Sequence, residues 1–496
     1  MLNISAVGRL PTRLFRADQV REIDRILIEE QGIPGLTLMR RAAAACCDVL
    51  LREWPGPSRV RVYCGSGNNA ADGYIVAGML AEQSIPTDVV IIGEIQKLGK
   101  DGRAAHAYCL QSRANMVETD EALEAPAVIV DALLGTGVKG APRPAYLDVI
   151  NRINQSEIPV LAVDVPSGLN VDTGTIAEAA IRAAVTVTFI GLKQGLFTAH
   201  GVDQVGKLCF ADLGADADIQ VPGPIVNRLE LAPLLSQIPE RARNAHKYKF
   251  GHVLVVGGDL GMGGAPLMSA LAAMRTGAGL VTLATRPEQA QILMAQQPEL
   301  MIRGVQSGEA LEPLLKQASL VVVGPGIGQG EWGESLFNRV MASNLPLVVD
   351  ADGLNLLARS PVKRGNWILT PHPGEASRLN PDIDVQADRF AAITAIQEKY
   401  GGTVVLKGAG TLVKGEQDQV GLCPYGNPGM STAGMGDVLA GVIGGVCAQL
   451  PELFTAAQTG VVLHSAAGDL CAERSGQRGL MATDLIPVVR ELINDL

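Results

Sequence analysis

A glycine-rich segment near the carboxyl end of the chain carries the residues best suited to chemistry. Residues 426–441 read GNPGMSTAGMGDVLAG, and the apolar spacing that follows Asp437 predicts a buried helix beginning at this carboxylate. Free amide groups and the positive dipole end at a helix N-terminus favour anions. Because an aspartate there would repel a phosphate, we expect Asp437 to act as a base on an attacking hydroxyl group. The alternative is a glycine-rich helix start without a ligand.

Other loops in the second half of the chain could contribute to the same site. Lys407-Gly-Ala-Gly-Thr411 offers a cation, two glycines and a hydroxyl group, which suit nucleotide phosphates and ribose. Glycines in the loops 257–265 and 324–328 permit close approach of the backbone. His372 follows a predicted strand and could contact a ligand or serve as a structural donor. The pair Asp350-Ala-Asp352 could bind a metal or cap a helix.

In the first half of the chain, a further glycine-containing loop follows a predicted strand and opens a predicted helix. Residues 64–73 read CGSGNNAADG, in which Gly65-x-Gly67-x-x-Ala70 fits the dinucleotide fingerprint, and Asp88 lies near the position of a ribose-binding acid. A tight turn without a ligand is the alternative. A plain phosphate cradle needs only backbone amides, so polar side chains in the turn suggest an additional cation or sugar hydroxyl. These side chains are Asn68, Asn69 and Asp72.

Two more predicted strands of the first half end in an aspartate. Asp131 ends VIVD and precedes an amide-rich loop at 135–140, whereas Asp164 ends VLAVD and is followed by Ser167. Ligands of doubly wound sheets bind beyond the carboxyl ends of the strands. Each aspartate could instead cap its own turn. Three polar strand ends with neighbouring glycines together favour a binding site.

Short β-branched runs alternate with helical patterns from residue 59 onward, which predicts α/β layers around parallel sheets. Two helices precede the first sheet, at 18–30 and 36–52, with Asp18 as the expected N-cap of the first and Gly32 as its stop. The strands expected in the first half are 59–64, 88–92, 127–131, 160–164 and 186–190, and the crossover helices are 72–83, 102–112 and 145–154. The strands expected in the second half are 252–256, 280–284, 320–323, 347–350, 367–369 and 403–406.

This pattern breaks in a proline-bearing stretch between residues 212 and 247. We therefore expect two α/β domains, 1–225 and 226–496, with the boundary placed to within about ten residues. The loop motifs of the two halves differ, which argues against an internal duplication.

Composition excludes several classes of function. The 496 residues carry a net charge of −10 and only 4% aromatic residues, which argues against nucleic-acid binding. The eight cysteines lack C-x-x-C spacing, and neither a signal peptide nor an apolar run long enough to cross a membrane is evident. These features predict a cytoplasmic protein with reduced cysteines and no membrane partner. The P-loop, G-x-S-x-G and H-E-x-x-H motifs do not occur.

The strings GSGNNAADG, VDALLGTGVKG and VDVPSGLNVDTG resemble the NAD(P)H-hydrate epimerase domain over most of residues 15–215. The resemblance implies a Rossmann-like three-layer αβα domain that binds a hydrated nicotinamide dinucleotide beside a potassium ion. By position it implies potassium (K⁺) ligands at Asn69, Asp131 and Ser167, and an acid/base at Asp164. It implies dinucleotide contacts at Asn68, Asn69, Ala70, Ala71, Asp72, Gly135, Thr136, Gly137, Val138, Lys139, Gly140, Ala141 and Asp164.

One position departs from the pattern of this family. Where the family usually has Gly-Gly, this chain has Ala70-Ala71. If either residue needed a positive φ, alanine would cost about 1–2 kcal/mol, and the two Cβ atoms could hold a phosphate away. A first domain that binds without catalysis is the alternative that this departure supports.

The strings NPGMSTAGMGDVLAG, KGAGT, TPHPGE and VGPGIG resemble the ADP/ATP-dependent NAD(P)H-hydrate dehydratase domain of the ribokinase-like superfamily, over roughly residues 240–495. The resemblance implies a ribokinase-like αβα domain that uses ADP with Mg²⁺ and yields AMP and phosphate. By position, it implies that the hydrate contacts Ala265, Gly326, His372 and Asp437. It implies that the adenine nucleotide is bound by Lys407, Gly408, Ala409, Gly410, Thr411 and Gly436.

Together the two resemblances imply a bifunctional metabolite-repair enzyme acting on NADHX and NADPHX, the hydrates of NADH and NADPH. The first domain would interconvert the R and S hydrates, and the second would dehydrate the S form. A homo-oligomer, namely a tetramer, is also implied. One alternative is a ribokinase-like small-molecule kinase with a non-catalytic first domain. Another is a nicotinamide dehydrogenase, which rests on the dinucleotide fingerprint alone.

Overall fold

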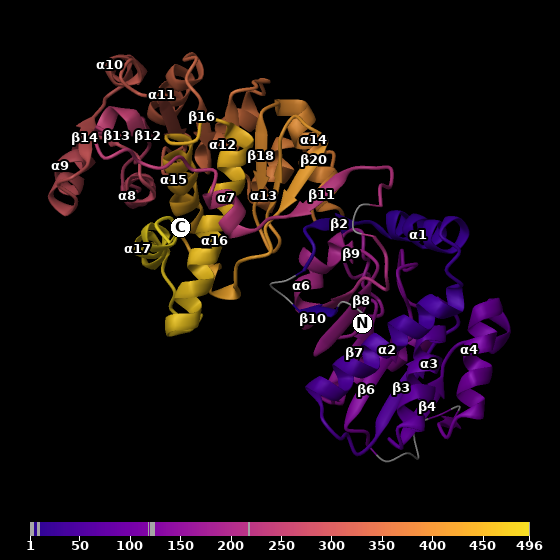
Figure 1. Ribbon diagram of the computed structural model, residues 1–496. Helices are drawn as coiled ribbons and strands as arrows, with labels where there is room; N and C mark the ends of the chain where they lie inside the picture. Colours follow the sequence, from indigo (N-terminus) through magenta and orange to yellow (C-terminus); the bar gives the residue numbers. More distant parts are fainter. Residues whose placement is uncertain (1–3, 7–9, 118, 120–124, 217–218, 496) are drawn as a thin grey trace. The chain divides into compact units, whose positions relative to one another are not determined.

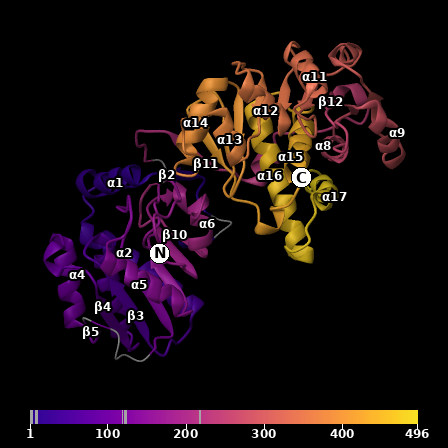
Figure 2. The same cartoon turned by 180° about the vertical axis from the view of Figure 1, so that it is seen from behind.

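The computed structural model describes residues 4–6, 10–117, 119, 125–216 and 219–495. The chain forms two compact units, Met1–Val226 and Asn227–Leu496, and each contains a sheet covered by helices (Figures 1 and 2). Both units are α/β with largely parallel sheets, as the alternating pattern predicted. No helix in the described ranges is long and apolar enough to span a membrane.

The sheet of the first unit has the strand order β1-β10-β8-β7-β6-β3-β4-β5. Neighbouring strands run parallel, apart from β1, which is antiparallel to β10. From β3 the chain builds β4 and β5 on one side and then β6, β7 and β8 on the other. The strand order therefore reverses between β3 and β6, and such a switch point opens a crevice at the carboxyl ends of the strands.

The strands of the first unit are β1 (Ile4–Ala6), β2 (Arg13–Phe15), β3 (Val60–Cys64), β4 (Thr87–Ile91), β5 (Asn115–Val117), β6 (Val128–Ala132), β7 (Val160–Val163), β8 (Val185–Phe189), β9 (Leu192–Lys193) and β10 (Lys207–Ala211). The short strands β2 and β9 pair with each other in parallel. The helices are α1 (Ala17–Arg25), the π-helix η1 (Ile26–Glu30), α2 (Gly35–Glu53), α3 (Asn68–Glu82), η2 (Ile95–Lys97), α4 (Lys100–Gln111), α5 (Pro144–Gln155), η3 (Gln194–Phe197) and α6 (Gly201–Gln204).

Two apolar cores cover the two faces of this sheet. On one face Val62 and Val130 pack with residues of α2 and α3, and on the other face Tyr63 and Ile129 pack with residues of α5. Alternate residues of a strand point to opposite faces. A strand that is covered on both faces is therefore apolar throughout, which explains the continuous apolar runs in the sequence.

The first helix begins differently from the prediction. Helix α1 starts at Ala17 and its N-cap is Arg16, so the expected N-cap role of Asp18 is wrong. Asp18 lies in the first turn, where its carboxylate pairs with Arg16 at 3.0 Å. The helix continues into the π-helix η1, and the backbone turns to a left-handed conformation at Gly32 (φ +71°).

Within the second unit the strand order runs β14-β13-β12-β15-β16-β17-β18-β19-β20, with β11 next to β20. The strands from β14 to β18 are parallel, and β19 and β20 are antiparallel additions. The strands are β11 (Ile225–Arg228), β12 (His252–Val256), β13 (Leu280–Thr285), β14 (Met301–Gly304), β15 (Leu320–Val323), β16 (Leu347–Val349), β17 (Trp367–Leu369), β18 (Thr403–Leu406), β19 (Leu412–Lys414) and β20 (Gln419–Leu422).

Helix α15 (Met435–Cys447) is the central helix of the second unit. Every residue from Val438 to Cys447 is buried, and the helix packs against α8 and α16. The approach to α8 is so close that a Cβ atom at Gly441 would lie 2.1 Å from the carbonyl oxygen of Ser269. The helices of this unit are α7 (Leu231–Leu235), η4 (Lys247–Phe250), α8 (Gly264–Thr276), α9 (Pro287–Gln296), η5 (Gly308–Leu311), α10 (Glu312–Leu315), α11 (Glu331–Met341), α12 (Asp352–Arg359), α13 (Pro373–Leu379), α14 (Arg389–Tyr400), η6 (Pro428–Met430), α15, α16 (Leu453–Ser475) and α17 (Ala482–Leu492).

Candidate active sites

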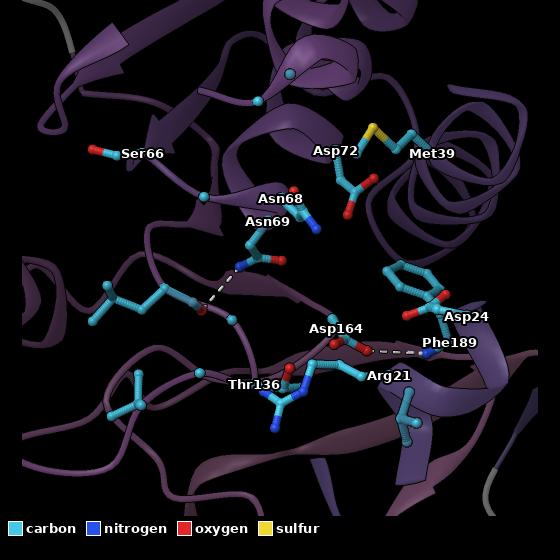
Figure 3. Close-up of a pocket in the computed structure, with 18 of the residues that line it drawn as sticks. Arg21, Asp24, Met39, Ser66, Asn68, Asn69, Asp72, Thr136, Asp164 and Phe189 are labelled. Carbon is cyan, nitrogen blue, oxygen red and sulfur yellow. Dashed lines mark hydrogen bonds between the residues drawn. The ribbon is translucent and has the colours of Figure 1, made fainter. Parts of the chain in front are cut away.

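A cavity of about 880 Å³ lies beyond the carboxyl ends of the central strands of the first unit (Figure 3). Ser66, Leu133, Asp164 and Ile190 line it, and each follows the end of β3, β6, β7 or β8 within two residues. The cavity thus occupies the switch point of the sheet, where the sequence placed a binding site. The predicted site residues that line it are Asn68, Asn69, Asp72, Gly135, Thr136, Gly137, Val138, Lys139, Gly140, Ala141 and Asp164.

Ala70 and Ala71 do not line this cavity, although the resemblance implied that they contact the dinucleotide. Both side chains are fully buried in the apolar core. The reason is that α3 begins at Asn68, so helical spacing turns residues 68 and 72 toward the cavity and residues 70 and 71 toward the core. Neither alanine has a positive φ. The strain considered for an Ala-Ala pair at this position is therefore absent.

Asp131 and Ser167 form a buried hydrogen-bonded pair beside the cavity. The Ser167 hydroxyl donates to Asp131 Oδ1 at 2.6 Å, and the Ser167 amide donates to Asp131 Oδ2 at 2.8 Å. Burial raises the pKa of Asp131 to about 6, against the lowering effect of the two Ser167 hydrogen bonds. Asn69 is 6% exposed and donates through Nδ2 to the Leu134 carbonyl at 3.0 Å. Its buried Oδ1 atom has no hydrogen-bond partner in the described structure.

Asp164 follows β7 and is held by an extensive set of donors. Its backbone has φ +63°, a strained conformation for a residue other than glycine. Oδ1 accepts hydrogen bonds from the Thr188 hydroxyl and the Phe189 amide, both at 3.2 Å, and from the ammonium group of Lys193. Lys193 is 1% exposed and also donates to the Phe189 carbonyl at 2.9 Å. These charged and polar donors fix the position of the carboxylate.

Sequence reasoning did not find Lys193 or Asp24, a further carboxyl group of the cavity. Both line the cavity with Asp72 and Asp164. Burial raises the pKa of Asp24 to about 6, with Lys193 opposing the rise and Asp164 adding to it. Burial also raises the pKa of Asp72 well above its usual value, and the charges of Asp164 and Asp24 contribute. Lys193 lies in β9 and Asp24 in α1, outside every motif that the sequence offered.

Asp88 does not take part in this site, so its interpretation as a ribose-binding acid is wrong. It is the second residue of β4, fully buried, and does not line the cavity. Its carboxylate lies 3.2 Å from Arg59 and 3.7 Å from Arg61, and it accepts a hydrogen bond from Asn115 at 3.0 Å. A ribose ligand binds beyond the carboxyl end of such a strand, whereas Asp88 lies near its start. The residue is a structural ion-pair partner.

In the second unit, Lys407 anchors a cluster of buried charges. Its ammonium group pairs with Asp350 at 2.6 Å and lies 3.9 Å from Glu375. Burial alone would lower the pKa of Lys407, but the two carboxylates outweigh burial and raise it. Burial raises the pKa of Glu375 to about 7 against the opposing charge of Lys407. Asp350 also accepts a hydrogen bond from the Thr370 hydroxyl at 2.8 Å, so the structure gives it an ion-pair role.

Asp437 lies in the first turn of α15, beside this cluster. Burial raises the pKa of Asp437 to about 6; the charge of Asp350 adds to the rise and that of Lys407 opposes it. Gly434 caps the helix in a left-handed conformation (φ +88°). A Cβ atom at Gly436 would lie 3.1 Å from Lys407 Nζ. A helix N-terminus, a lysine and a carboxyl group with a raised pKa therefore meet here, a combination suited to phosphoryl transfer from a nucleotide.

The loop Lys407–Thr411 is fixed by hydrogen bonds from Arg389, a residue that the sequence analysis did not single out. Arg389, which is 5% exposed, donates to the carbonyl groups of Leu406, Lys407 and Gly410 at 3.2–3.3 Å. Gly408 has φ +133°, and a Cβ atom there would lie 2.7 Å from Arg389 Nη1. The Thr411 hydroxyl donates to the Gly408 carbonyl at 2.9 Å. Arg389 thus fixes the shape of the loop.

Besides Asp437, the residues expected to contact the hydrate lie in the first turn of α8 and on two loops of the second unit. Gly326 has φ +58°, and its carbonyl accepts from the amides of Gly258 and Asp259 at 2.9 and 2.7 Å. Its Cβ position is 3.3 Å from Ala265 Cβ, so these two predicted residues are neighbours. His372 caps α13: Nδ1 accepts from the Gly374 amide at 3.0 Å. His372 therefore has a structural role at the start of this helix. Burial lowers the pKa of His372, and the charges of Lys407 and Arg378 add to this effect.

Comparison with known proteins matches each unit to a separate family. The family described as NAD(P)H-hydrate dehydratase matches residues 253–490, and the family described as YjeF-related protein N-terminus matches residues 35–195. A ribokinase-like superfamily protein from Enterococcus faecalis V583 is 30% identical to this chain, with a TM-score of 0.50, and the match covers 56% of this chain and 99% of that protein. The expected ribokinase-like fold of the second unit is thereby confirmed.

Some relatives match nearly the whole chain, including both units. The bifunctional NAD(P)H-hydrate repair enzyme Nnr of Coxiella burnetii is 48% identical over 488 residues, covering 97% of this chain and 100% of that protein. The Nnr enzyme of Escherichia coli K12 is 38% identical over 491 residues, covering 98% of this chain and 95% of that protein. Matches of this extent span both units, and so include the cavity of the first unit and the charged cluster of the second. The chain therefore belongs to the family of bifunctional NAD(P)H-hydrate repair enzymes.

Proposed function

We propose that the second unit dehydrates the S form of NADHX and NADPHX with ADP, giving NADH or NADPH, AMP and phosphate. The observation that carries this proposal is the position of Asp437 at the N-terminus of α15, beside Lys407. The name of the relatives supports the substrate. Residues 253–490, which match the dehydratase family, contain all of these groups.

The chemistry follows from the poor leaving ability of hydroxide. Asp437 removes the proton of the C6 hydroxyl group, whose oxygen attacks the terminal phosphorus of ADP while the bond to AMP breaks. Lys407 and the amides at the start of α15 balance the charge on the transferred oxygens. The lone pair of the ring nitrogen then expels phosphate from C6. Loss of a proton from the neighbouring carbon restores the dihydronicotinamide ring, so the products contain every atom of the reactants.

The nucleotide and the hydrate are assigned to different loops. ADP would be held by Lys407, Gly408, Ala409, Gly410, Thr411 and Gly436, and the hydrate by Ala265, Gly326, His372 and Asp437. The part of the chain that the structure describes has no cluster of three or more His, Cys, Asp or Glu side chains suited to a metal ion. Mg²⁺ would therefore be bound mainly through the phosphates of ADP, as is usual for this ion.

For the first unit we propose epimerisation of the R and S hydrates in the 880 Å³ cavity. Asp164 serves as an acid/base, and the dinucleotide is bound by the loop 135–141 and by Asn68, Asn69 and Asp72. The donor set beside the cavity fits a potassium ion, because the buried Oδ1 atom of Asn69 is otherwise unsatisfied in the described structure. Asn69, Asp131 and Ser167 would hold the ion, which would offset phosphate charge. Homotetramer formation and a cytoplasmic location remain proposals from the sequence.

The dehydratase is tested with purified S hydrate, ADP and Mg²⁺, followed by the return of the absorbance of NADH. We expect the natural chain to restore NADH and Asp437→Asn to lose about 100-fold or more of kcat, as the loss of a general base does. Retention of epimerase activity in Asp437→Asn would show that the variant is folded. Full activity of Asp437→Asn would contradict the assignment.

The same assay distinguishes the proposed dehydratase from the alternative, a small-molecule kinase. A small-molecule kinase would consume nucleotide in the presence of a vitamin or sugar alcohol and would leave the hydrate unrepaired. We expect no transfer to such alcohols, and we expect one AMP for each NADH restored. An excess of AMP over NADH would contradict the proposed stoichiometry.

A further inference from the structure

Epimerisation at C6 poses a geometric problem that one carboxylate does not solve alone. The hydroxyl group must leave from one face of the ring and return to the other. Departure needs a proton donor, because hydroxide leaves poorly, and addition of water on the opposite face needs a proton acceptor. This argument rests on the proposed epimerase function of the first unit. It requires two acid/base groups that reach the reacting carbon from different directions.

Four carboxyl groups line the cavity of the first unit, and three of them, Asp24, Asp72 and Asp164, lie in different environments. Figure 3 shows Asp24, Asp72 and Asp164 around the same part of the cavity, each carried by a different element. Asp164 is bound by Lys193 and two further donors. Asp72 has a buried Oδ1 atom without a hydrogen-bond partner in the described structure. The three groups also feel one another's charge.

These environments divide the roles of the three groups. Lys193, Thr188 and Phe189 hold the Asp164 carboxylate in place, and we assign it the role of proton acceptor. Burial and the charges of Asp164 and Asp24 raise the pKa of Asp72 well above its usual value. The pKa of Asp24 is raised to about 6, close enough to the working pH for the proton to be given up and recovered.

Helix α1 holds Asp24 in a fixed position. Val20, Ile23 and Leu27 are buried in the core of the unit. The helix N-terminus is tied down by a hydrogen bond of 2.7 Å from the Ala17 amide to the Asp172 carboxylate. The π-helix η1 starts directly after α1, and such wide turns are frequent at functional sites. Helix α1 lies outside residues 35–195, the segment that matches the family of the first unit.

We propose that Asp24 is the second acid/base residue of the epimerase and works across the nicotinamide ring from Asp164. Asp24 gives its proton to the C6 hydroxyl group, the C6–O bond breaks with help from the ring nitrogen lone pair, and water leaves. A water molecule adds to the other face of C6, and Asp164 takes its proton. The two carboxyl groups carry one proton between them before and after the reaction, and its return from Asp164 to Asp24 completes the cycle. No oxidant or additional reactant is needed.

The test compares Asp24→Asn with the natural chain on purified R hydrate, following formation of the S hydrate by chromatography after subtraction of the uncatalysed rate. We expect kcat to fall about 100-fold or more, with KM changed less than threefold, and Asp24→Glu to recover part of the loss. The control is Asp18→Asn, the same change on the same helix, at a side chain that is 58% exposed and outside the cavity. It is expected to match the natural chain.

Dehydratase activity on the S hydrate, measured in each variant, reports that the chain is folded. In the natural chain we expect epimerisation to slow as the pH rises above about 6, because the shared proton is lost. Burial of Asp24 and the charge of Asp164 raise its pKa to this value, and the charge of Lys193 opposes the rise. Asp24→Asn should lack that pH dependence.

A kcat of Asp24→Asn within twofold of the natural value, or a loss that lies entirely in KM, would overturn the proposal. Failure of the natural chain to epimerise would instead refute the proposed function itself.

Discussion

Asp437 lies at a helix N-terminus, a position that favours anions, but its burial disfavours the negative charge of its own carboxylate. The pKa of this carboxyl group is raised to about 6 by burial and by Asp350. A general base works only when it is deprotonated, so a raised pKa removes activity on the acid side. Its value still leaves the group mostly ionised at neutral pH. The residue can therefore accept a proton while remaining a stronger base than an exposed aspartate.

The pH dependence of the dehydratase follows from this environment. We expect kcat/KM on the S hydrate to be constant near neutrality and to fall as the pH drops through about 6, where Asp437 gains its proton. The measurement is initial rates with saturating ADP and Mg²⁺ between about pH 5 and about pH 8. A profile that stays flat down to pH 5 would show that another group accepts the proton.

Gly436 gives a second prediction at the scale of single residues. An alanine there would place its Cβ atom 3.1 Å from Lys407 Nζ, in the space that the proposed phosphate site would need. Its φ is not positive, so helix formation is not opposed and the Tm should stay the same or rise. We expect Gly436→Ala to raise KM for ADP about tenfold, the loss of roughly one charge-assisted hydrogen bond.

The control for this substitution is Gly330→Ala, at a helix start where a Cβ atom meets nothing within 4 Å. Calorimetry and ADP kinetics on both variants separate stability from binding. An unchanged KM in Gly436→Ala would place the phosphate elsewhere.

At the scale of elements, most of the parallel strands covered on both faces were predictable, with β10 as an exception, and several short strands were not. Strands covered on both faces are apolar throughout, so β12, β15, β17 and β18 were predicted with the bounds that the structure shows. The strands β5, β14, β19 and β20 were missed. They are three or four residues long, and β5 and β14 carry polar or exposed residues at the sheet edge, so neither length nor hydrophobicity marks them.

The same division applies to the sites. Residues that follow a strand in the sequence, such as Asp164 and Lys407, were found because glycine and polar residues mark the loop. Asp24, Lys193 and Arg389 were missed because they come from helices or short strands whose local sequence is ordinary. Only the tertiary fold brings them to the loops that they serve.

Asp88 shows how an element depends on one buried charge. Its carboxylate links β4 to Arg59 and Arg61, before and in β3, and to Asn115 in β5. Removing one partner of a buried ion pair costs about 3–5 kcal/mol. We expect Asp88→Ala to lower the temperature at which epimerase activity is lost, whereas the dehydratase of the same chain keeps its heat-inactivation midpoint. Asp88 lies outside the cavity, so kcat of the folded epimerase should not change.

Asp148→Ala on α5 is the matched control, because this aspartate is exposed and such changes cost less than about 0.5 kcal/mol. Equal heat inactivation of the Asp88→Ala epimerase and the natural epimerase would contradict the structural role of the ion pair.

At the scale of the whole molecule, two units with different folds act on the same kind of substrate. Each has its own cores and its own set of acidic and basic groups. In the proposed reactions the first unit consumes no nucleotide, whereas the second consumes ADP. Because only the S hydrate is dehydrated in this scheme, the epimerase determines whether a mixture of hydrates is repaired completely or only in part.

Because each proposed active site lies within one unit, each activity can be removed by a single substitution. The two variant chains can then be mixed to test whether together they repair the substrate. Asp164→Asn should dehydrate the S hydrate but leave the R hydrate of a mixture unrepaired, and Asp437→Asn should epimerise without restoring NADH. If the hydrate passes between the units through solution, an equimolar mixture of the two variant chains repairs the whole sample. Its rate should depend on the concentration of both variants. Repair that stops at the S fraction in the mixture would mean that the substrate must pass between the units of one chain or one assembly.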